Sequence, residues 1–408
     1  MELIISNGTG NASATIPEDI HGHGSHTASI AAGNREVEVS YGGMKPKISG
    51  MAPHAKLIVY DVCHGGTCSE LDLAAGVQFA AQDGVDVINY SISSMDSPYF
   101  DPIELAFLEA QRAGIFISAA AANSSGVGPT KGMVNHLGPW VSTVSATSHY
   151  RRYLPGPDIR AYFSLQGPAD FGLEVLKPDL AAPGILILAA SKDLPPGQDI
   201  LAEVEILSGT SMSTPFVAGS AAVLISAHPD WTPAEVKSAL MLTAKTTGMF
   251  KDAYGTPADP FDIGSGRIQV NLAVASGLVM DETAVNMAAA NPALGGDPKT
   301  LNLPTMQNNF CFKQCTWART LKSVSAVTVT YTVNSPPWVK VEPATFTLAE
   351  EATQTLKITA QESGVLTQTY LFAQIDLFPD PTSWPPLHLT AAVLFTPVTY
   401  YYLPIIGK

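Results

Sequence analysis

Basic residues are scarce in this 408-residue chain, which has 22 Lys and Arg against 36 Asp and Glu and a formal net charge of -14. Because no cluster of Lys or Arg exists to neutralise phosphates, the composition argues against a nucleic acid partner. No apolar stretch reaches the roughly 18 uninterrupted residues of a membrane-spanning helix. The first residues, MELIISNGTG, lack the basic and apolar regions of a signal peptide. The sequence therefore predicts no membrane span and no export signal within this chain.

Cysteine is also rare, and its four residues fall in two close pairs, Cys63 with Cys68 and Cys311 with Cys315. Such pairs are expected of two small local disulfides formed in an oxidising compartment, which predicts a secreted, extracellular protein. Two pairs of unrelated thiols are the alternative. A zinc site shared by all four is disfavoured because neither pair has CxxC spacing.

The chain is 46% hydrophobic, and its hydrophobic residues follow two different patterns in the earlier and the later part of the sequence. Between residues 55 and 147, short β-branched apolar runs alternate with helical patterns, which predicts an α/β domain with a mostly parallel sheet flanked by helices. The later part alternates apolar and polar residues between turns, which predicts a smaller all-β sandwich of antiparallel strands. The predicted organisation is an α/β domain at 1–280, a linker at 281–297, the sandwich at 298–396 and an apolar tail at 397–408.

Ser211 lies in SGTSMSTPFVAGSAAVLISAHP, where a strand gives way to a helix with Pro215 predicted in its first turn. A serine at a helix N-terminus has unpaired amides and the helix dipole beside it, which favour developing negative charge, so Ser211 is a candidate nucleophile. The alternative is a helix-capping serine. The string is not the GxSxG elbow of α/β-hydrolases, because Ser213 stands at its fifth position.

His23, in DIHGHGSHTASIAAG, is the candidate general base, since a serine hydroxyl needs a nearby imidazole to accept its proton. A helix is expected to end near Gly33. Metal chelation by His21, His23 and His26 is an alternative, but the trio lacks the HExxH pattern of zinc hydrolases.

Asn123 follows the apolar run IFISAAAA, at the carboxyl end of a predicted strand, where parallel sheets place their chemistry. A side-chain amide there can donate a hydrogen bond to the oxyanion of a tetrahedral intermediate. The alternative is an asparagine that opens a turn.

Taken in order, GHGSHTASIAAG, VDVINYSIS, AAAANSS and GTSMSTP resemble the subtilisin-like serine peptidases, the subtilase family, and the resemblance covers about residues 15 to 275. It implies a subtilisin-like fold and a serine endopeptidase that cleaves extended polypeptides, with Ser211 as nucleophile, His23 as base and Asn123 as oxyanion donor. The C-terminal strands resemble the fibronectin-III-like domain of related subtilases. The resemblance implies no cofactor. Calcium is common in the family, but the sequence assigns no metal ligands, and it does not give the oligomeric state.

The resemblance also implies substrate-binding residues on two strands. Ser91, Ile92 and Ser93 would pair edge to edge with an extended peptide, and Ala121 and Ala122 would lie beside the acyl site. Ser93 and Ala122 stand where the family commonly has glycine. We expect Ala122 to strain the backbone if that position needs a positive φ.

In this family the catalytic Asp precedes the His, at the end of an early central strand. Only Glu2, Glu18 and Asp19 precede His23, and MELIIS resembles the strand after the Asp-bearing one. We therefore expect the domain at 1–280 to lack its Asp-bearing first strand and its sheet to be open there. In subtilisin, loss of the Asp alone lowers kcat by about 3 × 10⁴. Asp19 as a replacement is disfavoured, and the alternative function is an inactive pseudoprotease that binds peptides without cutting them.

Overall fold

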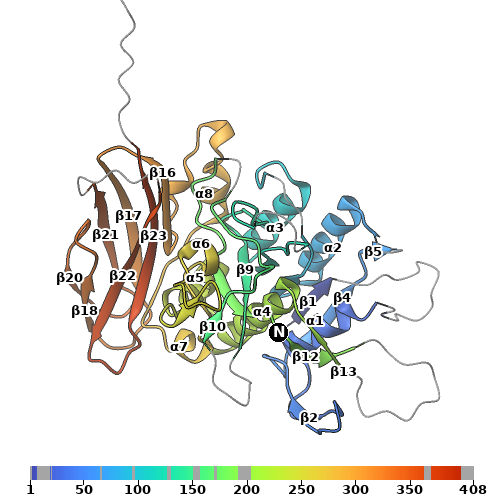
Figure 1. The fold of residues 1–408 in the computed structure, drawn as a ribbon. Coiled ribbons are helices and arrows are strands. Elements are labelled where there is room, and N and C mark those ends of the chain that lie inside the picture. The colour runs from blue at the N-terminus through green and yellow to red at the C-terminus, as the bar shows by residue number, and fades with distance from the viewer. Residues whose placement is uncertain are drawn as a thin grey trace, which may run out of the picture.

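The computed structural model describes residues 2–6, 19, 21–64, 67–93, 97–125, 130–149, 157–169, 172–191, 204–362 and 369–396. The predicted tail at 397–408 lies outside these residues. Figure 1 shows an α/β part, which carries the N-terminus, beside two C-terminal β-sheets.

The α/β part is built around a six-stranded sheet in the order β11-β9-β8-β7-β1-β4. Every neighbouring pair in this sheet is parallel, which confirms the predicted α/β architecture. Its strands are β1 (Glu2–Ser6), β4 (Lys56–Tyr60), β7 (Val87–Tyr90), β8 (Phe116–Ala120), β9 (Ser142–Thr147) and β11 (Leu180–Pro183).

Strand β1 lies in the interior of this sheet. It pairs on one side with β4 and on the other with β7, so that Ser6 is in register with both Tyr60 and Tyr90. The expectation of a sheet that is open at this point is therefore wrong, because the backbone of β1 supplies hydrogen bonds to both neighbours.

Helices cover both faces of the sheet at its central strands, which are buried on both sides. In β7, Ile88 packs in the core beneath α2 (Glu70–Asp83) and α3 (Pro102–Arg112). The adjacent Val87 packs in a second core with α1 (His23–Ala32), α4 (Thr210–Ala227) and α5 (Pro233–Leu242). As predicted, α1 ends immediately before Gly33.

Helix α4 is long and apolar enough to cross a membrane by length and composition, and it is the one such helix among the described residues. Two thirds of it (67%) is buried inside the structure, and it contacts β7, β8, β9 and β11. Its apolar residues are therefore accounted for by the core of the α/β part.

The α/β part also contains several shorter strands and helices. A hairpin of β12 (Ile187–Ala190) and β13 (Val204–Leu207) leads into α4. The others are β2 (Val37–Glu38), β3 (Lys47–Ile48), β5 (Cys63–His64), β6 (Thr67–Cys68), β10 (Asp158–Ile159), β14 (Met249–Phe250), α6 (Pro260–Ile263) and α7 (Val270–Val274). Both cysteine pairs form disulfides, Cys63 with Cys68 and Cys311 with Cys315.

The C-terminal strands form a four-stranded sheet, β15-β17-β21-β19, and a five-stranded sheet, β16-β23-β22-β18-β20, which share one apolar core. One pairing differs from the predicted antiparallel pattern, because β16 and β23 run parallel. The strands are β15 (Leu278–Val279), β16 (Thr305–Cys311), β17 (Gln314–Ser323), β18 (Val329–Asn334), β19 (Val339–Glu342), β20 (Thr345–Leu348), β21 (Thr353–Gln361), β22 (Leu371–Asp380) and β23 (Leu387–Phe395).

The segment predicted as a linker, 281–297, is partly helical. It contains α8 (Ala284–Ala289) and the 3-10 turn η1 (Pro292–Leu294), and η2 (Pro298–Thr300) follows it. Met287 is buried in the core beside α3, and its carbonyl accepts a hydrogen bond from the Tyr99 hydroxyl at 3.2 Å. The segment is therefore packed against the α/β part along its helical portion.

Candidate active site

The N-terminus of α4 carries Ser211 as the second residue of the helix. Gly209 precedes the helix in an extended conformation and supplies no side-chain cap. The cap comes instead from Asn123, whose Oδ1 accepts hydrogen bonds from Thr210 N at 2.9 Å and Thr210 Oγ1 at 3.2 Å. These bonds fix the orientation of the Asn123 amide, so that its Nδ2 lies 3.7 Å from where a Cβ on Gly209 would stand. The donor edge of Asn123 thus faces the turn that leads to Ser211.

Ser211 is tied to the end of β7 by two reciprocal hydrogen bonds. Its hydroxyl donates to Ser91 O at 3.2 Å, and the Ser91 hydroxyl donates to Ser211 O at 3.0 Å. The second bond has a cause in the sequence. Pro215 is the sixth residue of α4, one turn further in than predicted, and it has no N–H to give to the carbonyl four residues earlier. That carbonyl belongs to Ser211, and Ser91 supplies the missing donor.

His23 begins α1, after Gly22 in a left-handed conformation at φ 85. Burial lowers the pKa of His23 to about 4, the charges of His21 and His26 act in the same direction, and the charges of Asp19 and Glu205 oppose them. The imidazole is therefore neutral at pH 7, which is the state a general base requires.

Asp19 holds the backbone in front of α1. Its Oδ1 accepts hydrogen bonds from the amides of His21 at 3.1 Å and Gly22 at 2.8 Å, and its Oδ2 accepts from the amide of Ser25 at 2.7 Å. Burial opposes ionisation, but these amides outweigh it and hold the pKa of Asp19 below its usual value. Both carboxylate oxygens are thus committed to capping the helix, which argues against Asp19 as the partner of an imidazole.

His26 is fully buried and serves the adjacent hairpin. Its Nε2 lies 3.1 Å from Ile187 O and 3.3 Å from Glu205 O, so this nitrogen carries the proton and bonds β12 to β13. Burial lowers the pKa of His26. Within the described ranges, no group of three or more His, Cys, Asp or Glu side chains is placed to hold a metal ion. His26 thus bonds the hairpin, whereas His21 and His23 line the cavity that contains Ser211.

The three predicted catalytic residues line one cavity of about 320 Å³. Strand β13 forms one wall of it, and Glu205 and Leu207 are among its lining residues. Glu205 is a residue that the sequence motifs miss, because nothing in AEVEIL marks a carboxylate for this site. The full lining comprises His21, His23, Asn123, Glu205, Leu207, Ser208, Gly209, Ser211 and Met212.

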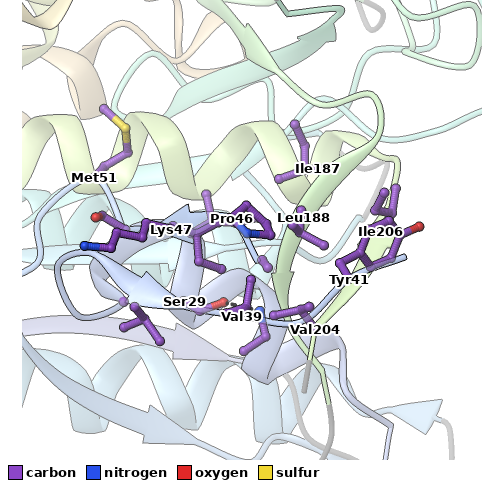
Figure 2. Close-up of a pocket in the computed structure, with 18 of the residues that line it drawn as sticks. Ser29, Val39, Tyr41, Pro46, Lys47, Met51, Ile187, Leu188, Val204 and Ile206 are labelled. Carbon is purple, nitrogen blue, oxygen red and sulfur yellow. Dashed lines mark hydrogen bonds between the residues drawn. The ribbon is translucent and has the colours of Figure 1, made fainter. Parts of the chain in front are cut away.

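A second, larger cavity of about 650 Å³ lies behind β13 (Figure 2). Side chains alternate along a strand, so Val204 and Ile206 line this second cavity while Glu205 and Leu207 line the first. Ile187 and Leu188 of β12 and Val39 add further apolar wall (Figure 2). A single strand therefore separates an apolar cavity from the one that contains Ser211.

The predicted substrate strand is arranged in three different ways. Ser91 is buried and bonded to Ser211, Ile92 is half-buried against the core, and Ser93 is exposed. None of the three is among the residues that line the Ser211 cavity in the described structure.

Ala121 and Ala122 are both buried, and neither is among the lining residues of the Ser211 cavity. Their carbonyls accept hydrogen bonds from Asn135 N at 3.2 Å and Leu165 N at 3.0 Å respectively. Ala122 has φ 75, so this position does need a positive φ, and the predicted backbone strain is present.

Comparison with known proteins identifies the family. The model of the subtilase family matches residues 5–266. The subtilisin-like protease SBT1.6 of Arabidopsis thaliana is 28% identical, over 71% of this chain and 58% of that protein. SBT1.5 of the same plant is also 28% identical, over 66% of this chain and 55% of that protein. SBT3.13 is 27% identical over 88% of this chain and 67% of its own length.

The chain thus spans little more than half the length of the first two of these relatives. The family match covers most of the chain, including five of the six strands of the α/β sheet (β4, β7, β8, β9 and β11), His23, Asn123 and Ser211. The chain belongs to the subtilase family.

Proposed function

We propose that this protein is a serine endopeptidase that hydrolyses peptide bonds of extended polypeptides through an acyl-enzyme. Ser211 attacks the scissile carbonyl, His23 takes up and returns the proton, and Asn123 Nδ2 with the Ser211 amide stabilises the oxyanion. The observation that carries the proposal is that an imidazole, a hydroxyl and a carboxamide from three separate segments line one cavity.

The helix geometry supports Ser211 as the nucleophile. Its place in the first turn of α4 puts its hydroxyl at the N-terminal end of the helix, where the helix dipole stabilises negative charge. The Ser211 hydroxyl donates to Ser91 O, so a turn of its side chain toward His23 belongs to the catalytic cycle. Catalytic hydrogen bonds are often formed only in the complex with substrate.

Charge around His23 supports its role as the base. Proton uptake turns the imidazole into a cation, and the carboxylates of Asp19 and Glu205 both favour that cation. Asp19 is engaged with backbone amides, whereas Glu205 is a wall residue of the cavity itself. Asp19 has the larger effect on the pKa of His23, and Glu205 adds to it from the wall of the cavity.

The proposal extends to the C-terminal strands and to location. The two packed sheets built from β15 to β23 support a fibronectin-III-like sandwich, although the parallel β16–β23 pair departs from a purely antiparallel one. The two disulfides support an extracellular, oxidising environment.

The test is labelling by a fluorophosphonate, which reacts with activated serines, with the modified peptide located by mass spectrometry. We expect labelling at Ser211 that is lost in Ser211→Ala and His23→Ala. Ser213→Ala is the matched control, because this neighbouring hydroxyl is buried and bonded to Thr210 O at 2.9 Å. Asn123→Asp retains the acceptor for Thr210 but loses the donor, so we expect a rate lowered by about 10² to 10³ in a folded protein.

Two outcomes would contradict the proposal. Equal labelling of Ser211→Ala would show that the reactive serine is elsewhere. A folded chain that binds peptides but never labels would instead support the pseudoprotease, which binds extended peptides without cleaving them.

A further inference from the structure

A buried chain of polar groups ends on the strand that the proposed peptidase offers to its substrate. His136 Nδ1 lies 2.8 Å from Glu104 Oε1, and His136 Nε2 lies 2.8 Å from Ile92 O. The side chains of His136 and Glu104 are 1% and 5% exposed. Neither residue lines the Ser211 cavity or belongs to a motif discussed above.

The distances determine where the protons lie. A carbonyl oxygen can only accept, so a contact of 2.8 Å to Ile92 O requires a proton on Nε2. The contact to Glu104 requires a second proton, on Nδ1 or on the carboxyl. In either case Nε2 is the donor to Ile92 O, and the contact of Glu104 with Nδ1 holds the orientation of the ring.

The surrounding backbone holds His136 and Glu104 in place. His136 has φ 54, and its carbonyl accepts a hydrogen bond from Thr143 Oγ1 at 2.5 Å. The other oxygen of Glu104 accepts from Gly138 N at 3.2 Å, and a Cβ at Gly138 would stand 2.5 Å from that oxygen. A left-handed histidine backbone costs free energy, so it persists here because several contacts over-determine it.

The link to the proposed active site is one peptide bond long. Ile92 follows Ser91, whose carbonyl and hydroxyl both bond to Ser211. Successive carbonyls of an extended segment point in opposite directions, so Ser91 O faces Ser211 while Ile92 O faces His136.

We propose that His136, held by Glu104, is a positioning residue that fixes the Ile92 carbonyl and thereby the edge that Ser91, Ile92 and Ser93 present to an extended peptide. This inference rests on the proposed function. A fixed edge is pre-organised for strand pairing, which lowers the entropy lost when the peptide binds.

The test uses two variants of the full chain. His136→Asn tolerates the positive φ but is too short to reach Ile92. Glu104→Gln is the matched control, because its amide can donate to His136 Nδ1 and accept from Gly138 N, which leaves Nε2 protonated. Labelling rates of Ser211 are compared for a small alkyl fluorophosphonate and for a tetrapeptidyl phosphonate that occupies the substrate strand.

For His136→Asn we expect labelling by the tetrapeptidyl probe to slow roughly 10- to 100-fold, as for one lost hydrogen bond in a buried chain, while the small probe keeps its rate. Glu104→Gln should leave both rates within about threefold of the parent, a change well below one lost hydrogen bond. The matching spectroscopic signature is a solvent-protected Nε2–H signal of His136 in ¹⁵N spectra of the parent and of Glu104→Gln.

Three results would overturn the inference. The first is equal slowing of both probes in His136→Asn, which would mean general damage to Ser211. The second is an unchanged rate with the tetrapeptidyl probe, and the third is an Nε2 without a proton. Failure of the proposed function is distinguishable, since the parent would then label with neither probe.

Discussion

The bond from the Ser91 hydroxyl to Ser211 O should matter only because Pro215 removes the usual donor. In Ser91→Ala that carbonyl loses its partner, since no N–H at position 215 can replace it. The same change takes an acceptor from Asn89 Nδ2, which bonds to Ser91 Oγ at 3.1 Å. Pro215→Ala restores an amide one helical turn after Ser211 and should repair the first loss but not the second.

The magnitude follows from the two groups that are left without partners. Each buried polar group without a partner costs about 1 to 3 kcal/mol, so Ser91→Ala, which leaves two of them, should lower the free energy of unfolding by about 2 to 6 kcal/mol. In the Pro215→Ala background the same substitution should cost about 1 to 3 kcal/mol less, because the helical amide now pairs with Ser211 O. The direct effects of Pro215→Ala on helix propensity cancel in this comparison.

The assay is urea unfolding of the four proteins in this double-mutant cycle, followed by near-UV circular dichroism and compared where their m-values agree. A matched control cycle combines Pro215→Ala with Ser118→Ala in place of Ser91→Ala. The Ser118 hydroxyl bonds to Thr214 O at 3.0 Å. Residue 215 cannot supply that carbonyl's helical partner, so the control cycle should be additive. If the Ser91 and Pro215 effects also add within about 0.5 kcal/mol, the explanation given for this bond is refuted.

Three further predictions concern the site and its supports. Ala122→Gly should change the free energy of unfolding, measured in urea, by less than about 1 kcal/mol. The relief of about 1 to 2 kcal/mol of left-handed strain is offset by the lost burial of the methyl group and by the greater entropy of glycine in the unfolded chain. A change above about 2 kcal/mol would contradict this balance. Because only the neutral imidazole accepts a proton, the labelling rate of Ser211 should fall as the pH is lowered, with a midpoint near the His23 pKa of about 4. A midpoint near pH 6.5 would contradict the effect of burial on this pKa. Replacing Cys63 and Cys68 by serine should cost about 2 kcal/mol, as expected for so short a closed loop, and an unchanged urea midpoint would count against that estimate.

Much of the α/β architecture could be predicted from the sequence because it depends on local signals. The apolar runs of β7 and β8 are bounded by turns, and their alternate residues Val87 and Ile88 enter the cores on opposite faces of the sheet. The residues gathered in the Ser211 cavity could also be identified, since Asn123 follows a strand end and Ser211 opens a helix. The strain at Ala122 was predictable for the same reason, as one residue type conflicts with one backbone conformation.

What the sequence could not give depends on contacts between distant segments. The slot between β4 and β7 is filled by β1, although the residues of β1 do not specify their neighbours. Glu205 belongs to a short hairpin strand and reaches the cavity only because side chains alternate along β13.

Ser91 shows why the role of a site residue can change once the structure is known. The sequence suggests a residue whose backbone pairs with a peptide, yet its side chain completes the hydrogen bonding of a helix more than a hundred residues away. That task exists because Pro215 leaves a carbonyl without a helical donor, so two residues that look independent in the sequence are parts of one hydrogen-bonding unit. The same reasoning applies on the other side of the strand, where His136 holds the next carbonyl. The segment at residues 91–93, which follows β7, is therefore held from both sides by side chains. A substitution at Ser91 or His136 should disturb peptide binding even though neither side chain needs to touch the peptide.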